Sequence, residues 1–404
     1  MSSKTETQTN KNIDFIFCSF FPVGLEDYAQ FFAEYFDDFK YLKWKFPHSK
    51  DKNAYSVLET YKDGKLAKSK KLYSFSRAGT ELYFLLLPFN YLIYLFQALA
   101  LIFVPREKGK KVVFMGINYY CTFCGILLKK LGRVDYVIYR VMDFFPLPDS
   151  GPYRLLTKIF YQFDKFCLTR SDFLWFTTEG HILGREKYGY FDRKKVNYEM
   201  IPLGINMDKV VVATPDEKNS HAIVYCGVVN RYHLLDLVFE AVEKLKKTFP
   251  DLVFNVIGDG PDLNYYKELS NTKKLGKSVV FHGYMEENEK FYKTISENSL
   301  GIALYRDEEN LMKYTEPAKV KYYLNFGIPA IISKVPQIAF ELDKREVSFA
   351  VDNTIESIAG VIKKYFSDPK MRQKYRSNLL NYIKEVDVKM LLRDRFEKLE
   401  NSIK

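Results

Sequence analysis

Several features that would place this chain in a common class are missing from its sequence. The opening MSSKTETQTNKN is polar and lacks the apolar core of a signal peptide, so we expect a cytosolic protein. No G-x-x-x-x-G-K-[ST] segment occurs, which argues against a P-loop ATPase. Cysteine is scarce, with five residues in the whole chain. Cys121 and Cys124 form a C-x-x-C, but no second pair or histidine cluster completes a zinc set, so reduced structural thiols are expected.

Apolar and basic residues are abundant instead. Hydrophobic residues make up 47% of the 404 positions, enough for packed cores in two domains. Lys and Arg number 61 against 50 Asp and Glu, and the formal charge of +11 favours anionic partners. The excess gathers in Lys40–Lys71 and Arg106–Lys111, on either side of one apolar segment. This favours an anionic membrane surface over nucleic acid, because the clusters lack interleaved aromatic platforms on a recognisable module.

The apolar segment between these clusters, Leu82–Val104, is long enough to span a bilayer. Pro88, Asn90 and Gln97 interrupt it, however, and strand-like Val112–Met115 follows closely. We therefore expect a helix that is either buried or seated at a membrane interface, with its flanking lysines at the level of the lipid headgroups. A core helix surrounded by solvated lysines is the alternative.

Short apolar runs alternate with helical patterns in both halves of the chain. Ile13–Phe17 leads through a Pro and Gly loop into an amphipathic helix, and VVFMGINYY and DYVIYRVMDFFP both read as strands that end in loops. Ala222–Ser333 repeats strand and helix in the same way. The pattern predicts an α/β fold with two Rossmann-like doubly wound parallel-sheet domains facing a cleft, with ligands at the carboxyl ends of the strands.

The stretch Lys313–Ser333, KYTEPAKVKYYLNFGIPAIIS, defines one of these strand ends in detail. Glu316 or the threonine before it can cap a helix, Pro317 suits the first turn, and the glycine of NFG stops it. The apolar AIIS that follows reads as a buried parallel strand. A ligand at the start of this helix would meet free N–H groups and Lys319, which favours phosphate.

PAKVKYYLNFGIPAI within this stretch resembles the donor-binding segment of GT-B glycosyltransferases, especially family 4, whose pattern is Pro-x-Lys-x-x-Glu-Tyr-Leu-x-x-Gly-x-Pro-Val-Ile. The family usually has two glutamates here, one near the donor sugar and one on the ribose, where this chain has Tyr314 and Tyr322. Glu316 either substitutes for one of these carboxylates or is only an N-terminal charge favoured by the helix dipole.

The resemblance continues through the C-terminal half and implies further donor contacts. Gly227 in AIVYCGVVNRYH lets the backbone approach a ligand, and Arg231 is placed to reach its diphosphate. The family's usual lysine is missing at this turn, so His233 or Lys319 would have to make up the charge. The G-D-G-P glycines are interpreted as a tight turn. The candidates for the base pocket are His282, Gly283, Tyr284 and Met285.

The N-terminal half agrees with the family mainly in pattern, and its strand ends supply the acceptor-side candidates. Asp143 follows a strand at the position where family 4 commonly has a histidine and inverting GT-B enzymes, such as glucuronosyltransferases, have a catalytic carboxylate. It is either a base for the acceptor hydroxyl or a cap for the next turn. Gly24 and Glu179 are further acceptor-side candidates. His181 is a second base candidate, although a lone histidine in a loop is more often simply solvated.

These segments predict the domain organisation of the chain. We expect a disordered tail at 1–12, an acceptor-binding domain at 13–206 with a membrane-associating segment at 72–111, a nucleotide-sugar-binding domain at 207–385, and a final helix at 386–404 that returns to the first domain.

The resemblance implies a glycosyltransferase of the hexosyltransferase type, with Asp143 and Glu316 as catalytic candidates. A UDP- or GDP-sugar would donate to a hydroxyl of a membrane-associated glycan or lipid-linked acceptor, in polysaccharide or glycolipid synthesis at the inner face of the plasma membrane. The D-x-D metal anchor of the other large glycosyltransferase fold is absent, so no metal or other cofactor is expected. A non-catalytic pseudo-transferase that binds nucleotide sugar or anionic lipid, and a sugar-nucleotide epimerase of the same fold, are the alternatives.

Overall fold

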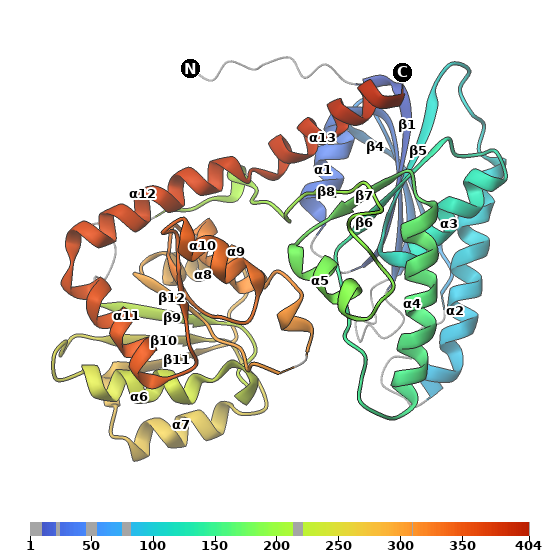
Figure 1. The fold of residues 1–404 in the computed structure, drawn as a ribbon. Helices are drawn as coiled ribbons and strands as arrows, with labels where there is room; N and C mark the ends of the chain where they lie inside the picture. Colours follow the sequence, from blue (N-terminus) through green and yellow to red (C-terminus); the bar gives the residue numbers. More distant parts are fainter. Residues whose placement is uncertain are drawn as a thin grey trace, which may run out of the picture. The chain divides into compact units, whose positions relative to one another are not determined.

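The computed structural model of the protein describes residues 10–21, 25–45, 55–74, 82–212, 221–308 and 310–403. The chain forms two compact units that divide between Ile201 and Pro202. Each unit is built on one sheet covered by helices (Figure 1). The prediction of an α/β fold with two Rossmann-like domains is therefore confirmed.

The sheet of the N-terminal unit has the strand order β4-β3-β2-β1-β5-β6-β7-β8. Its strands pair in parallel from β2 to β8, whereas β3 and β4 add an antiparallel hairpin at one edge. The order reverses between β1 and β5, so the ends of these two strands form the switch point where ligands bind in open α/β sheets. The elements are β1 Asn10–Phe21, α1 Glu26–Tyr35, β2 Phe36–Lys45, β3 Ser56–Lys62, β4 Lys65–Leu72, α2 Leu82–Leu99, η1 Ala100–Phe103, β5 Lys111–Ile117, α3 Asn118–Lys130, β6 Tyr136–Val141, α4 Pro152–Arg170, β7 Phe173–Phe176, α5 Glu179–Lys187 and β8 Glu199–Met200.

Alternating side chains of β1 explain the two helical layers on this sheet. Phe15 and Phe17 pack against Phe32 of α1 on one face. Cys18 and its even-numbered neighbours point to the other face, where α2, α3 and α4 complete one hydrophobic cluster. Because both faces are covered, the central strands are apolar runs without the polar alternation of a one-sided sheet.

The apolar segment that was expected to be a buried or interfacial helix forms α2 and the short η1. Tyr94 is fully buried and donates a hydrogen bond to the carbonyl of Lys45 at 2.7 Å, which ties the helix to β2. In the part of the chain that the structure describes, no helix is both long and apolar enough to cross a membrane.

The hairpin of β3 and β4 was not predicted, and it changes the meaning of the basic cluster at Lys40–Lys71. Lys40 forms an ion pair with Asp14 at 2.6 Å, so part of this charge is used inside the unit. The lysines of β4 are exposed at the edge of the sheet instead. Exposed lysines on an edge strand also oppose pairing with another chain. The cluster is therefore partly structural.

The sheet of the C-terminal unit is entirely parallel, with the order β11-β10-β9-β12-β13-β14. Its switch point lies between β9 and β12. The elements are η2 Met207–Lys209, β9 Ala222–Cys226, η4 Arg231–His233, α6 Leu235–Leu245, β10 Val253–Ile257, α7 Leu263–Thr272, η5 Gly276–Ser278, β11 Val279–Gly283, α8 Glu289–Ser296, β12 Leu300–Ala303, η6 Leu311–Lys313, α9 Ala318–Asn325, β13 Ala330–Ser333, α10 Gln337–Lys344, β14 Phe349–Val351, α11 Ile355–Ser367, α12 Pro369–Glu385 and α13 Val388–Ile403.

The helix predicted from KYTEPAKVKYYLNFG is α9, and the strand predicted after it is β13. Pro317 occupies the N-cap position, and Gly327 follows the helix with a φ of 63°, which favours glycine. Tyr323 and Leu324 are buried in the cluster that also holds β13. Local sequence signals therefore located the helix and the strand correctly, but the predicted cap was wrong, because Pro317 itself is the N-cap and no side chain caps the helix. The return of α13 to the first domain stays a prediction.

Candidate functional site

The switch point of the C-terminal sheet carries the lysine that the sequence singled out. Lys319 lies in the first turn of α9, and its side chain reaches the end of β9. The Nζ atom lies 4.8 Å from the ring centroid of Tyr225 and 5.5 Å from that of Tyr305. A β-carbon added to Gly227 would lie 2.6 Å from Lys319 Cε, so the lysine packs directly on this glycine. Gly227 therefore serves the close approach of a side chain.

His233 is the hydrogen-bond partner of Lys319. The Lys319 Nζ atom lies 2.8 Å from His233 Nε2, and no ion pair between Lys319 and a carboxylate exists among the described residues. Burial lowers the pKa of Lys319 to about 7. Burial, and then the charge of Lys319, lower the pKa of His233 to about 4, so the imidazole is neutral at neutral pH and can accept a hydrogen bond. Within the described part of the chain, the site is therefore a desolvated cation without a counter-ion, which suits an incoming anion.

This arrangement makes a testable pH dependence. A bound phosphate stabilises the charged lysine, so binding above pH 7 requires uptake of one proton by Lys319. We expect the affinity for UDP to fall by roughly tenfold for each pH unit above this value. Isothermal titration calorimetry in buffers of different ionisation enthalpy measures both the affinity and the proton uptake.

The matched control for this pH dependence is Lys319→Met, which should show a weaker affinity that is flat over the same range. The stability of the unliganded wild-type protein should change with pH in the opposite direction to its affinity for UDP. Because the pKa of Lys319 is lower in the folded state than in the unfolded chain, the unfolded chain binds more protons above pH 7, and stability should rise with pH there. Equal pH slopes for wild type and Lys319→Met would contradict the assignment.

Two glycines of the G-D-G-P turn lie beside this site, and their role is structural, as the sequence favoured. Gly258 has a φ of 136°, and an added β-carbon would lie 1.9 Å from the carbonyl oxygen of Gly227. An added β-carbon on Gly260 would lie 2.3 Å from the carbonyl oxygen of Val229. The loops after β9 and β10 therefore pack backbone to backbone.

Arg231 lies on the same short turn as His233 but has a different partner. Its guanidinium stacks at 3.9 Å from the ring centroid of Tyr265 and forms a loose ion pair with Asp262 at 3.7 Å. The side chain is exposed, with 53% of its surface accessible. The two candidates to replace the missing family lysine are His233 and Lys319, and the structure brings them into contact with each other. Arg231 as a diphosphate contact stays a prediction.

The two tyrosines at the family's glutamate positions differ in their environments. Tyr314 is buried, with 4% of its surface exposed. Tyr322 donates a hydrogen bond to the carboxylate of Glu287, and burial, followed by this partner, raises the pKa of Tyr322. Burial raises the pKa of Cys226 to about 11, while Lys319 lowers it and Glu287 raises it, so both charges lie near the end of β9. Sequence reasoning missed Glu287, because its loop position after β11 carries no motif.

Glu316 is directed to the segment that opens the unit. Its Oε2 atom accepts a hydrogen bond from the backbone N–H of Leu203 at 3.3 Å, and its charge acts on Tyr382. This contact gives Glu316 a structural role at the start of the unit, and its role toward a donor stays a prediction. Among the base-pocket candidates, Gly283 has a φ of 68° and Tyr284 is 75% exposed. The side chain of His282 forms a hydrogen bond with that of Asn255. Met285 is partly buried and packs against the hydrophobic cluster that holds β13.

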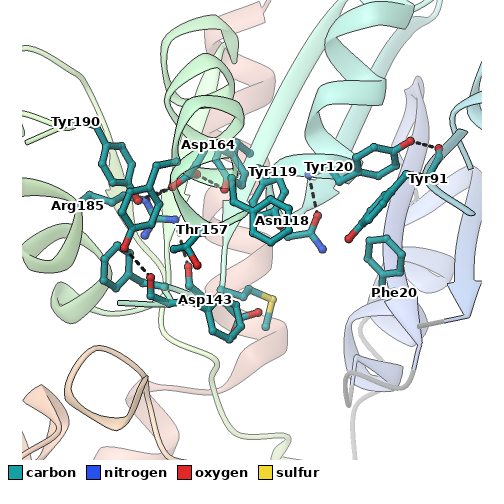
Figure 2. A pocket seen from close by; sticks show the side chains of 16 residues that line it. Phe20, Tyr91, Asn118, Tyr119, Tyr120, Asp143, Thr157, Asp164, Arg185 and Tyr190 are labelled. Atoms are coloured by element: carbon teal, nitrogen blue, oxygen red, sulfur yellow. Dashed lines mark hydrogen bonds and ion pairs between the residues drawn. The ribbon is translucent and has the colours of Figure 1, made fainter. Parts of the chain in front are cut away.

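The N-terminal unit has a pocket at its own switch point, with a volume of about 110 Å³ (Figure 2). The pocket lies at the ends of β1, β5 and β6, where it is lined by Phe20, Asn118 and Asp143, respectively. Asn118 has a φ of 65°, and its side chain accepts hydrogen bonds from the backbone of Tyr120 and Cys121. The aromatic residues that line the pocket are Phe20, Tyr91, Tyr119, Tyr120, Tyr139, Phe144, Phe145, Phe160, Tyr161 and Tyr190.

Asp143 is the sequence-predicted residue that lines this pocket. The residue as a whole is exposed to solvent. Partial desolvation of its carboxylate at the pocket raises the pKa of Asp143, and the charge of Arg185 partly opposes the rise. The backbone carbonyl of Asp143 accepts a hydrogen bond from Arg185 at 3.2 Å, which fixes the chain that carries it. A carboxyl group with a raised pKa at a strand end suits proton transfer.

A buried ion pair closes one side of the pocket. Arg185 Nε donates to Asp164 Oδ2 at 2.8 Å, and both side chains are almost inaccessible. Tyr139 and Tyr190 donate hydrogen bonds to the same carboxylate at 2.5 and 3.0 Å. Figure 2 shows this group on one side of the pocket and Tyr91, Tyr120 and Phe20 on the other. Sequence reasoning missed the pair, since Asp164 and Arg185 resemble ordinary charges on helical surfaces.

Three other acceptor-side candidates were predicted. Of these, Gly24 lies outside the described residues. Glu179, the first residue of α5, forms an ion pair with Arg193. His181 corrects the expectation of a solvated loop histidine, because it lies in α5 and is completely buried. Burial, and then the charges of Arg185 and Arg140, lower its pKa, so it is a neutral core residue. The side chain of Thr178 caps this helix by accepting a hydrogen bond from the backbone N–H of Gly180.

Comparisons with known proteins bear on both units. Residues 208–381 match the sequence profile of the family described as "Glycosyl transferases group 1". No curated protein sequence matches the chain. Sucrose-phosphate synthase (tll1590) from Thermosynechococcus elongatus aligns over 97% of this chain and 100% of its own, with 13% identity and a TM-score of 0.66. Anabaena Alr3699/HepE in complex with UDP aligns over 96% and 100%, with 12% identity and a TM-score of 0.64.

A third solved structure is similar over nearly the whole chain, and the sequence profile names the family that residues 208–381 resemble. The UDP-forming α,α-trehalose-phosphate synthase from Burkholderia xenovorans aligns over 98% of this chain and 100% of its own, with 12% identity and a TM-score of 0.63. Identities this low establish the fold, which is GT-B. The profile match assigns the segment with Lys319 to the group 1 glycosyltransferases. The resemblance drawn from PAKVKYYLNFGIPAI is therefore confirmed.

Proposed function

We propose that this protein transfers a sugar from a nucleoside-diphosphate sugar to a hydroxyl of a glycan or lipid-linked acceptor. The observation that carries the proposal is Lys319, a desolvated cation with no carboxylate partner among the described residues, at the switch point of the segment that matches the group 1 profile. UDP is the nucleotide in the complex of Anabaena Alr3699/HepE, and the Burkholderia xenovorans synthase is UDP-forming. These neighbours favour a UDP-sugar over a GDP-sugar as the donor.

The donor's diphosphate would lie at the start of α9. Lys319 and the free N–H groups of the first turn of the helix would neutralise the leaving diphosphate, and His233 would hold the lysine in place. The family's glutamate is missing at the position of Tyr322. Glu287 would supply a carboxylate in its place, and Tyr322, which is hydrogen-bonded to Glu287, would supply a hydroxyl. Among the described residues, no group of three or more His, Cys, Asp or Glu side chains could hold a metal ion. We propose a reaction that needs no metal.

The acceptor would bind in the tyrosine-lined pocket of the N-terminal unit. Aromatic rings offer apolar faces with polar edges, and Asp143 offers a carboxylate for the reacting hydroxyl. Two of the neighbours are named as synthases of sucrose phosphate and trehalose phosphate. A lipid-linked or membrane-associated acceptor is proposed for this chain on the basis of its apolar α2 and its basic segments, together with a peripheral position at the inner face of the plasma membrane.

The proposal is tested first by binding. Thermal shift and calorimetry with UDP, GDP, ADP and their sugars should show stabilisation by one nucleotide family, and we expect UDP. Nucleotide release in the presence of a lipid extract then tests turnover. A pseudo-transferase would bind without releasing nucleotide, whereas an epimerase would convert the sugar nucleotide to its epimer without an acceptor. Absence of binding by every nucleotide would overturn the proposed function.

Asp143→Asn tests the acceptor side separately. We expect the rate of sugar transfer to fall by roughly a hundredfold or more, since general-base catalysis contributes about 10²–10⁴-fold. The affinity for UDP should stay unchanged, because no donor contact is proposed for Asp143. Asp149→Asn, an exposed carboxylate in the loop that follows, is the matched control and should transfer sugar at the wild-type rate. An Asp143→Asn variant with normal transfer would leave this residue only its capping role.

A further inference from the structure

Three helices of the N-terminal unit form one layer with an unusual outer surface. Figure 1 shows α2, α3 and α4 side by side along the sheet, and all three contribute to the same hydrophobic cluster. Tyr91 of α2 packs on Tyr120 of α3 with ring centroids 4.4 Å apart. Phe123 of α3 packs on Phe163 of α4 at 5.5 Å. The layer is therefore continuous, and its outer side is one surface.

Large apolar side chains are exposed on both outer helices of this layer. On α2, Phe89, Leu92 and Phe96 follow at i, i+3 and i+7, and they are 56%, 51% and 68% exposed. On α4, Leu155 and Ile159 follow one helical turn apart and are 66% and 44% exposed. Single exposed apolar residues are normal, but a surface that gathers them over neighbouring helices marks an interaction site.

The charges of the same layer are almost all of one sign. Helices α2 and η1 contain no charged residue, and α3 contributes only lysines. Asp164 is the single carboxylate of α4, and it is buried in its ion pair with Arg185. Lys158 and Lys165 are exposed on α4, and neither forms an ion pair among the described residues. The surface therefore combines apolar side chains with uncompensated positive charge, which is complementary to an anionic lipid leaflet.

We infer that the outer face of α2, α3 and α4 docks on an anionic bilayer surface, with Phe89, Leu92 and Phe96 in the interface. The inner side of the same layer lines the proposed acceptor pocket through Tyr91, Tyr120 and Tyr161. Docking on this face would bring the pocket wall to the level of a lipid-linked acceptor. This link to the acceptor depends on the proposed function, whereas docking itself depends only on the surface. The sequence predicted an interfacial segment at 72–111, and α4 is the addition that the structure makes.

The experiment measures co-sedimentation of the full chain with vesicles of phosphatidylcholine alone or mixed with phosphatidylglycerol. We expect binding to the mixed vesicles and little to the neutral ones. The variant Phe89→Ser/Leu92→Ser/Phe96→Ser should bind at least about tenfold more weakly. Lys158→Glu/Lys165→Glu should lose about tenfold or more, because each basic residue near an anionic surface contributes about a factor of five. Phe340→Ser/Met390→Ser removes exposed apolar residues from the C-terminal unit and is the matched control.

Each outcome decides the inference. Equal sedimentation of wild type and both surface variants would overturn it, as would wild-type protein that binds neither kind of vesicle. Light scattering that shows a wild-type dimer and a monomeric triple-serine variant would identify the face as a protein interface and would also overturn it. A thermal shift with UDP on the same samples shows whether the variants are folded. The same measurement separates failure of docking from failure of the proposed transferase.

Discussion

Lys319→Ala should lose roughly ten- to a hundredfold of its affinity for UDP at pH 6.5, because a hydrogen bond to a charged group contributes about 1.5–3 kcal/mol. At this pH the wild-type lysine is mostly charged, since its pKa is about 7. The lysine makes its close contacts with Gly227, His233 and two tyrosine rings, so alanine removes the charge without breaking an ion pair. Calorimetric titration with UDP measures the effect, and sugar transfer should fall at least as much.

The control for this prediction is Lys277→Ala. Lys277 lies in η5, at the amino end of β11 and therefore at the opposite edge of the sheet from the switch point. Its removal changes the net charge by the same amount and should leave the affinity for UDP within about twofold, as expected for a remote surface charge. Equal losses for the two variants would mean that only net charge matters. Wild-type affinity in Lys319→Ala would remove the main support for the donor site.

Asp164→Asn should be the most destabilising of the proposed substitutions. It leaves the buried guanidinium of Arg185 without its charge partner, and breaking a buried pair from one side costs about 3–5 kcal/mol. The tyrosines at 139 and 190 can still donate to the amide oxygen, so the loss is chiefly electrostatic. At about 2–4 °C for each kcal/mol in a unit of this size, the melting temperature should fall by roughly 6–20 °C. Differential scanning calorimetry checks this.

Two further variants show whether the buried charge is the cause. Asp192→Asn breaks the exposed pair with Lys195, and surface pairs contribute about 0–1 kcal/mol, so its melting temperature should barely change. Arg185→Met in the Asp164→Asn background removes the unpaired cation and should recover part of the loss. A melting temperature of Asp164→Asn close to that of wild type would show that water solvates the guanidinium of Arg185 or that another group compensates its charge.

The sequence located the helix and strand of the candidate donor segment well because their signals are local. The start of α9 at Pro317, its end before Gly327 and the buried strand after it depend on residues that are adjacent in the chain. The lysine of this helix was therefore placed correctly at the switch point. Its contact with His233, 86 residues away, was not predicted, because the two residues were only alternatives for the family's missing lysine and the folded sheet brought them together.

The surroundings of the candidate acceptor residues were predicted less completely. Asp143 was identified because it follows a strand, which is again a local signal. His181 was expected in solvent and is buried, since the position of α5 against β6 and β7 cannot be read from the residues around the histidine. The aromatic lining of the pocket comes from β1, β6, three helices and two loops, and no spacing in the sequence relates these positions to one another.

The sequence by itself determined the alternation of strands and helices, the donor segment and the candidate carboxylate at the end of β6, because periodicity, capping and turn residues act over a few positions. Only the tertiary structure decided which of these groups are desolvated, which charges neutralise one another, and which apolar residues remain exposed. Burial and electrostatic pairing are collective properties of segments that are distant in the chain, so they appear only when the sheet has assembled.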